Sequence, residues 1–286
     1  MADWYLYSLV ALLLLGTQRF LYKVAAERDC SSGLTTAVFM GMVTLLSGVV
    51  FLFTDSPLPN LSLLMLLALV NSISFAVATI AHIEALRHLP AGITFPLTRL
   101  NLGVVVVVSV SYFGEQLSPW QWLGVLVGFA VVAVLARDAG SEVRPAGSRR
   151  AGFCLVAICV VCGAIAAISS KVAAVSTSTS GFMAMSYLLG TGFALVIERH
   201  WGRGKKPGRR RAAIGIGAIM GILNFVGFYA FLLALQSGPL SAIALITGMH
   251  FVIASGLSVL LYQERLTMAR TVGIGLTLLS VVLLRQ

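Results

Sequence analysis

The sequence predicts an all-α membrane protein in which ten transmembrane helices form two inverted five-helix repeats. Three observations support this fold class. First, 58% of the residues are hydrophobic and only 10% are charged, whereas soluble domains carry about 25% charged residues. Second, apolar runs of about twenty residues, each long enough to cross the hydrocarbon core of a bilayer, recur along the chain. Third, the two halves of the chain share a sequence pattern.

The predicted spans are separated by connectors rich in Gly, Pro and charged residues. The spans fall at 4–25, 32–53, 63–86, 91–112, 119–136, 151–174, 181–197, 212–235, 239–261 and 268–285. The longest connectors, RDAGSEVRPAGSRR and ERHWGRGKKPGRRR, follow the fifth and the seventh span. We therefore expect a first repeat at 1–138, a linker at 139–150 and a second repeat at 151–286.

The repeat is visible when the sequence is compared with itself. A shift of 149 residues aligns ALRHLPAG…FGEQLSPWQWLG with ALQSGPLS…YQERLTMARTVG without a gap, and a shift of 148 aligns Lys23 with Lys171. A repeat with an odd number of spans enters the membrane with its second copy upside down, and inverted repeats around a midplane site recur in transporters. Glu115 and its partner Glu264 follow helix ends, where we expect structural roles.

The net charge of +10 is distributed unevenly. Nearly all basic residues of the connectors follow odd-numbered spans, and the densest cluster lies between 199 and 211. By the positive-inside rule these connectors face the cytoplasm and both termini face outward, which predicts a multi-pass protein of the cytoplasmic (inner) membrane. Because this charge sits in short gaps between spans, we expect the lipid bilayer as a partner and no nucleic acid.

Short motifs at the ends of two spans resemble the drug/metabolite transporter superfamily, EamA type. L-x-x-x-P precedes the fourth and ninth spans, and G-E-x-L or Q-E-x-L follows them. The resemblance covers nearly the whole chain. It implies a transporter and not an enzyme, with a central cavity lined by the first, third, fourth, sixth, eighth and ninth helices. Members of the superfamily carry amino acids, nucleotide sugars, sugar phosphates, choline and drugs.

The first span also resembles the small multidrug resistance proteins, in the stretch from Gly16-Thr17 to Lys23. Those proteins carry a proton-coupling glutamate three residues before the glycine. Leu13 stands at that place in this chain. We therefore do not expect proton-coupled export of cations by that mechanism.

Polar residues near the middle of the fourth and ninth spans are the first candidates for a binding site. An ionisable side chain at the bilayer centre costs about 2.5–3.5 kcal/mol on insertion scales and marks a functional site by default. Arg99 and Asn101 lie in the fourth span, and His250 is the repeat partner of Asn101. We expect these three residues to line one cavity, with a buried structural pairing as the alternative. Pro96 can kink the fourth helix beside them.

The third span carries a polar or small stripe. Asn71, Ser74, Ala78 and His82 recur at helical spacing, so they face protein or water and not lipid. Asn224 of the eighth span lies one turn from the repeat image of this stripe. We expect Asn71, Ser74, His82 and Asn224 to contribute to the binding site. Interhelical hydrogen bonds are the alternative for the two asparagines.

Arg19 of the first span is a further candidate, because it lies deeper than Lys23 on the same helix face. Guanidinium groups bind carboxylate and phosphate oxygens bidentately. If Arg19 and Arg99 share the cavity, the expected small-molecule solute is an organic anion or an amino acid, moved by a secondary exporter or exchanger through alternating access. Neutralisation of one arginine by Glu84 is the alternative.

No cofactor is expected. Cys159 and Cys162 have C-x-x-C spacing, but their apolar run offers no second ligand pair for zinc. Gly124 and Gly128 form G-x-x-x-G, a close-packing face for internal contacts or for a homodimer. Two other functions stay open: an intramembrane lipid-handling enzyme, and a non-transporting scaffold whose basic loop binds anionic lipid.

Overall fold

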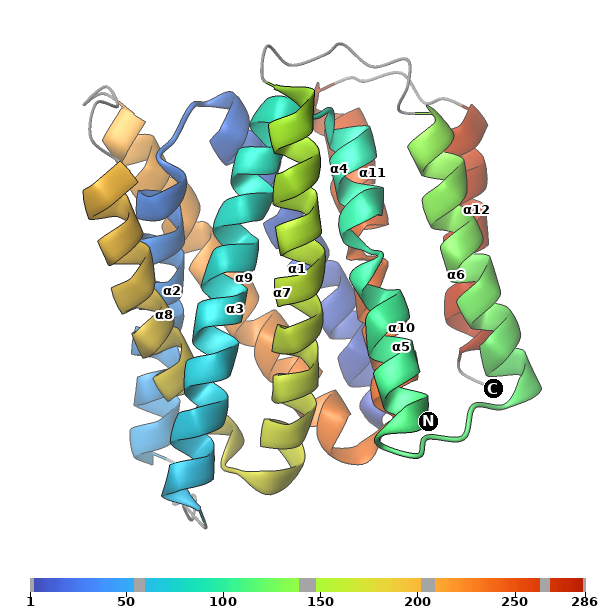
Figure 1. Cartoon of the computed structure of the whole chain (residues 1–286), viewed down its shortest axis with the longest axis horizontal. Helices are drawn as coiled ribbons and strands as arrows, with labels where there is room; N and C mark the ends of the chain where they lie inside the picture. Colours follow the sequence, from blue (N-terminus) through green and yellow to red (C-terminus); the bar gives the residue numbers. More distant parts are fainter. Residues whose placement is uncertain (1–2, 54–59, 139–147, 202–208, 263–267, 285–286) are drawn as a thin grey trace.

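The computed structural model describes residues 3–53, 60–138, 148–201, 209–262 and 268–284, and within these ranges it contains helices and no strand. The helices lie side by side in one bundle (Figure 1). They are α1 (Asp3–Glu27), α2 (Ser32–Phe53), α3 (Leu61–His88), α4 (Ala91–Thr98), α5 (Asn101–Ser111), α6 (Pro119–Asp138), α7 (Arg149–Ser176), α8 (Thr179–Trp201), α9 (Arg210–Ser237), α10 (Leu240–Gly248), α11 (His250–Tyr262) and α12 (Met268–Leu283). The all-helical fold class is therefore confirmed.

Seven stretches of the described chain are long and apolar enough to cross a bilayer. They are α1, α2, α3, α7, α9, most of α8, and α10 together with α11. Helix α5 and the apolar parts of α6 and α12 are shorter. Three of the ten predicted spans depend on these shorter helices, so the count of ten remains a prediction.

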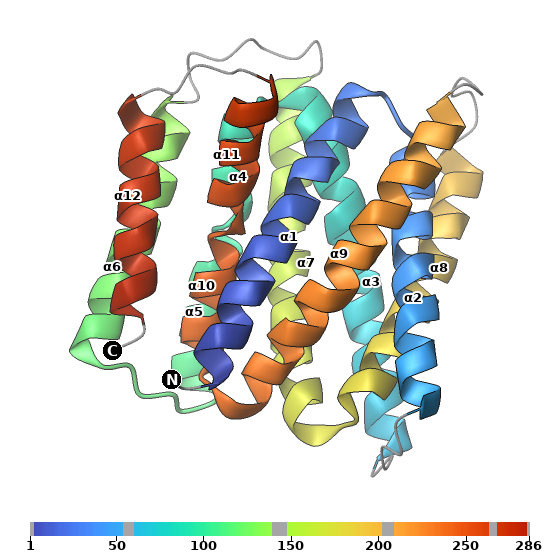
Figure 2. The same cartoon turned by 180° about the vertical axis from the view of Figure 1, so that it is seen from behind.

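The two halves of the chain run through the bundle in opposite directions. Helix α1 begins at the end of the bundle where α12 finishes, whereas α7 begins at the opposite end (Figures 1 and 2). The sequence repeat aligns α1 with α7, so their opposed directions agree with an inverted repeat. Helices of the two halves also interleave, because α3 contacts α7, α2 contacts α8, and α1 contacts α9 and α11.

Two spans that were expected to be continuous helices are interrupted. The span at 91–112 is divided into α4 and α5, and the span at 239–261 into α10 and α11. At the first break, backbone N–H groups bond to carbonyl groups three residues earlier: Leu100 to Leu97, Leu102 to Arg99, and Gly103 to Leu100. At the second break, the N–H of Met249 bonds to the carbonyl of Ile246. Such bonds tighten the chain locally and are typical of interrupted helices.

The two breaks occupy equivalent places in the repeat, since Arg99 aligns with Gly248. The sequence pointed to a kink at Pro96, but the first break lies three residues further along the chain. The repeat partner of Pro96 is Leu245, so a proline cannot explain the second break. At that break α10 packs closely on α5, since a Cβ atom on Gly248 would lie 2.5 Å from Cδ1 of Leu102.

The G-x-x-x-G face of α6 is used inside the chain. A Cβ atom on Gly124 would lie 3.0 Å from Cγ of Leu284, and one on Gly128 would lie 2.9 Å from Cε of Met249. The hydroxyl of Ser280 donates to the carbonyl of Gly124 over 2.7 Å. This face therefore makes internal contacts, and a homodimer would need a different surface.

Glu115 holds the beginning of α10. Its carboxylate accepts hydrogen bonds from the backbone N–H groups of Leu240 (2.6 Å) and Ser241 (3.0 Å) and from the Ser241 hydroxyl (2.6 Å). These N–H groups belong to the first helical turn, where intrahelical partners are missing. Lys171 bonds to the carbonyl groups of Leu235 and Gly238 at the end of α9. The structural role that was expected for Glu115 is confirmed.

Candidate functional site

A cavity of about 120 Å³ lies between the two halves of the chain. Its wall includes residues from both helix breaks and from α1, α3, α7 and α9. Six of the eight predicted site residues line this cavity: Arg19, Asn71, Arg99, Asn101, Asn224 and His250. The sequence therefore predicted most of the polar residues in the wall of one cavity, although these residues are scattered along the chain.

Arg99 and His250 join the two breaks. Nη1 of Arg99 lies 3.1 Å from Nε2 of His250, and Nη2 donates to the hydroxyl of Thr98 over 3.2 Å. Nδ1 of His250 bonds to the carbonyl of Thr247. Because a carbonyl oxygen only accepts, Nδ1 carries the hydrogen, and Nε2 is left to accept from Arg99. His250 is therefore neutral and adds no charge to the cavity.

Arg19 reaches the cavity from α1. Its guanidinium carbon lies 4.8 Å from the ring centroid of Tyr22, within the range of a cation–π interaction. Nη1 of Arg19 lies 3.5 Å from Nδ1 of His82. His82 itself is fully buried and, like Ser74, is not among the described residues that line the cavity. His82 therefore contacts Arg19, a residue of the cavity wall, without lining the cavity itself.

The position of His82 is explained by the packing of α3 against α7. Ala78 and Ala81 form a buried cluster with Cys159, and further along α3 a second cluster contains Leu89 and Val156. These small and apolar contacts pack α3 closely against α7 beside the cavity. The stripe on α3 correctly predicted that His82 faces protein and not lipid. It did not show that His82 lies outside the cavity wall.

Asn71 is fully engaged in hydrogen bonds between helices. Its Nδ2 donates to the carbonyl of Ala166 (2.9 Å) and to the hydroxyls of Ser169 and Ser170 (both 3.0 Å). Its Oδ1 accepts from the hydroxyl of Ser186 over 2.8 Å. The amide thus ties α3 to α7 and α8, which is the interhelical alternative that the sequence left open.

Asn71→Leu is therefore expected to lower the free energy of unfolding by about 1–2 kcal/mol, since a side chain of similar size removes all of these bonds. Thermal unfolding of the purified protein in detergent would measure the loss. Ser186→Ala removes only one of the bonds and serves as a graded control with a smaller expected loss. An unchanged unfolding temperature for Asn71→Leu would contradict this role.

Asn224 belongs to a chain of buried hydrogen bonds. The hydroxyl of Tyr187 donates to Oδ1 of Asn224 (2.5 Å), Nδ2 of Asn224 donates to Oε1 of Gln18 (2.9 Å), and Nε2 of Gln18 donates to the Tyr22 hydroxyl (3.2 Å). This chain fixes the ring beside Arg19. Sequence reasoning missed Gln18, although a glutamine next to Arg19 in an apolar span was a visible signal.

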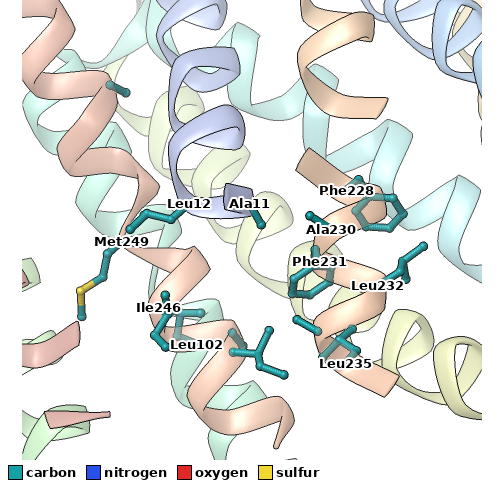
Figure 3. Close-up of a cluster of buried hydrophobic side chains, with 14 of the residues drawn as sticks. Ala11, Leu12, Leu102, Phe228, Ala230, Phe231, Leu232, Leu235, Ile246 and Met249 are labelled. Carbon is teal, nitrogen blue, oxygen red and sulfur yellow. The ribbon is translucent and has the colours of Figure 1, made fainter. Parts of the chain in front are cut away.

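Part of the cavity wall is aromatic, and the sequence analysis missed this part as well. Phe228 stacks on Phe75 and Phe231, with ring centroids 6.3 and 5.8 Å apart. These three residues line the cavity. Figure 3 shows Phe228 and Phe231 on one side of the apolar core and Leu102 and Ile246 on the other. The cavity therefore combines cationic groups with a large apolar surface.

Within the described ranges, no carboxylate lies within ion-pair distance of Arg19 or Arg99. Glu84, the partner considered from the sequence, instead pairs with Arg87 over 3.4 Å and accepts from the Ser32 hydroxyl over 2.6 Å. Two further ion pairs among the described residues join Glu27 to Lys23 and Asp29 to Arg209. Among the described residues the two cavity arginines therefore have no counter-ion. Arg99 is buried, and a buried cation without a counter-ion carries a large desolvation penalty.

Comparison with known proteins identifies the family. The model of the EamA-like transporter family matches residues 3–137 and 150–286. The chain belongs to the EamA-like transporter family. The family resemblance predicted from the paired motifs is thereby confirmed, and the two matched segments account for the internal repeat.

The fold of this EamA-like protein recurs among solved structures, of which 29 chains match. One, titled only as the crystal structure of a protein, has a TM-score of 0.78 and 18% sequence identity, and the match covers 99% of this chain and 96% of that one. At this identity the likeness supports the fold alone. No curated protein sequence matches the chain.

The cavity of this EamA-like protein is lined by the spans that the resemblance implied. They correspond to α1, α3, the α4–α5 pair, α7, α9 and the α10–α11 pair. Helices α6 and α12 pack against each other at one edge of the bundle (Figure 1). The site therefore lies where the two family repeats meet.

Proposed function

We propose that this EamA-like protein is a secondary active transporter that moves a small organic anion or amino acid across the membrane by alternating access. The observation that carries the proposal is the pair Arg19 and Arg99 on the wall of a cavity between oppositely directed halves. Family membership favours transport over the lipid-handling enzyme and the scaffold that were considered from the sequence.

The charge of the cavity supports an anionic solute. At 4 Å and an effective dielectric constant of 20, two opposite unit charges attract by about 4 kcal/mol. A carboxylate near Arg99 would gain this attraction together with charge-assisted hydrogen bonds. His250, which is neutral and accepts from Arg99, orients the guanidinium group without competing as a counter-ion.

The aromatic wall supports a solute that also has an apolar part. Phe75, Phe228 and Phe231 cannot satisfy the hydroxyl groups of a sugar phosphate, and burying a polar group without a hydrogen bond is costly. The same rings would pack well against a phenyl or branched aliphatic group. Carboxylates with an apolar side are therefore the favoured solutes.

The paired breaks support alternating access. Discontinuous helices that meet near the bilayer midplane are a recurrent feature of inverted-repeat transporters. Here α4 and α10 are short helices of 8 and 9 residues that end at equivalent breaks. In this account these breaks act as hinges, and exchanging the conformations of the two halves moves the opening of the cavity from one side of the membrane to the other.

The proposal is tested by uptake of labelled solute into liposomes that contain the purified protein and are preloaded with the same unlabelled solute. Phenyllactate and phenylalanine serve as test solutes, together with benzylsulfonate and benzyltrimethylammonium, a permanently charged pair that differs in the sign of its charge. We expect saturable uptake of the anions, competition among them, and no saturable uptake of the cation, because the cavity is positive. Equal uptake of both signs, or rates equal to those of protein-free liposomes, would overturn the proposal.

A further inference from the structure

The cavity holds two cations and lacks a protein counter-ion among the described residues. Both cations come from the first half of the chain. Their repeat partners are Ala167 for Arg19 and Gly248 for Arg99, and both partners also line the cavity. The second half therefore contributes small, neutral residues at the positions that correspond to the arginines.

Polar atoms at the same place have no hydrogen-bond partner on the protein among the described residues. Nε of Arg99 and Oδ1 of Asn101 are buried and have no hydrogen-bond partner among the described residues. A buried donor or acceptor without a partner is costly. The protein itself thus leaves this part of the cavity wall short of negative charge and of hydrogen-bond partners among the described residues, and a bound carboxylate supplies the charge.

These deficits have different consequences for the loaded and the empty carrier. Alternating access passes through a state in which the cavity is closed on both sides, so that water leaves it. With an anion bound, the arginines keep a counter-ion throughout this step. Without an anion, the closing protein must enclose uncompensated cations, which carries a large desolvation penalty for each ion.

We propose that this protein is an obligate anion exchanger, in which Arg19 and Arg99 prevent the empty carrier from changing its orientation. The inference rests on the proposed function and adds its mode of coupling. The solute itself is the missing counter-ion, and each inward step of one anion is tied to the outward step of another. A gradient of one anion then drives the movement of a second.

The experiment compares exchange with net uptake in the same liposomes. Uptake of labelled phenyllactate is measured with unlabelled phenyllactate inside, and with an impermeant buffer inside instead. We expect exchange to be at least about 10-fold faster than net uptake, given the penalty for enclosing an unpaired ion. Equal rates would overturn the inference and leave the proposed function standing, whereas the absence of both activities would overturn the proposed function.

Two variants test whether the positive charge of the cavity is the cause of slow net uptake. Arg19→Gln lowers the charge of the cavity, and Ala167→Asp introduces a carboxylate at the repeat partner of Arg19. In either variant the ratio of exchange to net uptake is expected to fall toward one, because the empty cavity encloses less net charge. Unfolding temperatures identify a variant that fails to fold, and the other variant then decides. A ratio that stays at the wild-type value in a folded variant would contradict the role of the cavity charge.

Discussion

Arg99→Gln is expected to reduce saturable anion uptake by roughly 100-fold, because truncating one member of a desolvated charged contact typically costs about 2–5 kcal/mol. The substitution removes the positive group from the wall of the cavity. Glutamine keeps a polar amide at this position while removing the charge. Initial rates of labelled phenyllactate uptake into liposomes preloaded with unlabelled phenyllactate would measure the effect.

Arg209→Gln is the matched control. Arg209 is exposed, pairs with Asp29, and does not line the cavity. We expect its substitution to leave uptake within about 2-fold of wild type, since exposed ion pairs contribute about 0–1 kcal/mol. Wild-type uptake by a folded Arg99→Gln variant would remove Arg99 from the binding site.

Gly16→Ala is expected to lower the free energy of unfolding by about 1–3 kcal/mol, the usual cost of overpacking a tight contact. A Cβ atom on Gly16 would lie 2.6 Å from Cβ of Ile253 and 2.9 Å from the carbonyl oxygen of His250. The added methyl group would push α1 away from α11, and Arg19, almost one turn along α1, would move with it. We therefore expect slower transport together with a lower unfolding temperature.

The same substitution at Gly48 of α2 provides the control, because a Cβ atom there would meet nothing within 4 Å. Alanine has the higher helix propensity, by about 1 kcal/mol in a helix interior. Gly48→Ala should therefore keep or raise the unfolding temperature. If the two variants unfolded at the same temperature, the close packing of α1 on α11 would not be a source of stability.

The sequence predicted the bundle because two strong signals agreed. Long apolar runs located the helices, and the alignment of Lys23 with Lys171 and of Pro90 with Pro239 located the repeat. The breaks were missed because they depend on backbone hydrogen bonds and on contacts such as that of Gly248 with Leu102. Hydropathy does not report such contacts between distant segments.

The candidate site was predicted in part, for a comparable reason. Arg99, Asn101 and His250 are conspicuous in apolar spans, because polar groups are costly in lipid. Phe228 and Phe231 are not, since an aromatic residue that lines a cavity has the same hydropathy as one that faces lipid. Periodicity on α3 predicted the direction of His82, but it does not report the packing of Ala78 and Ala81 against Cys159 of α7.

The central claim is that one anion-binding cavity is reached from either side of the membrane. It is tested most directly by Ala167→Cys, which places a thiol on the cavity wall, in a background that lacks the native cysteines Cys30, Cys154, Cys159 and Cys162. An impermeant thiol reagent is applied to each side of the membrane in turn. Modification from both sides, slowed in each case by phenyllactate, is the predicted result. Modification from one side alone, unaffected by phenyllactate, would contradict the claim.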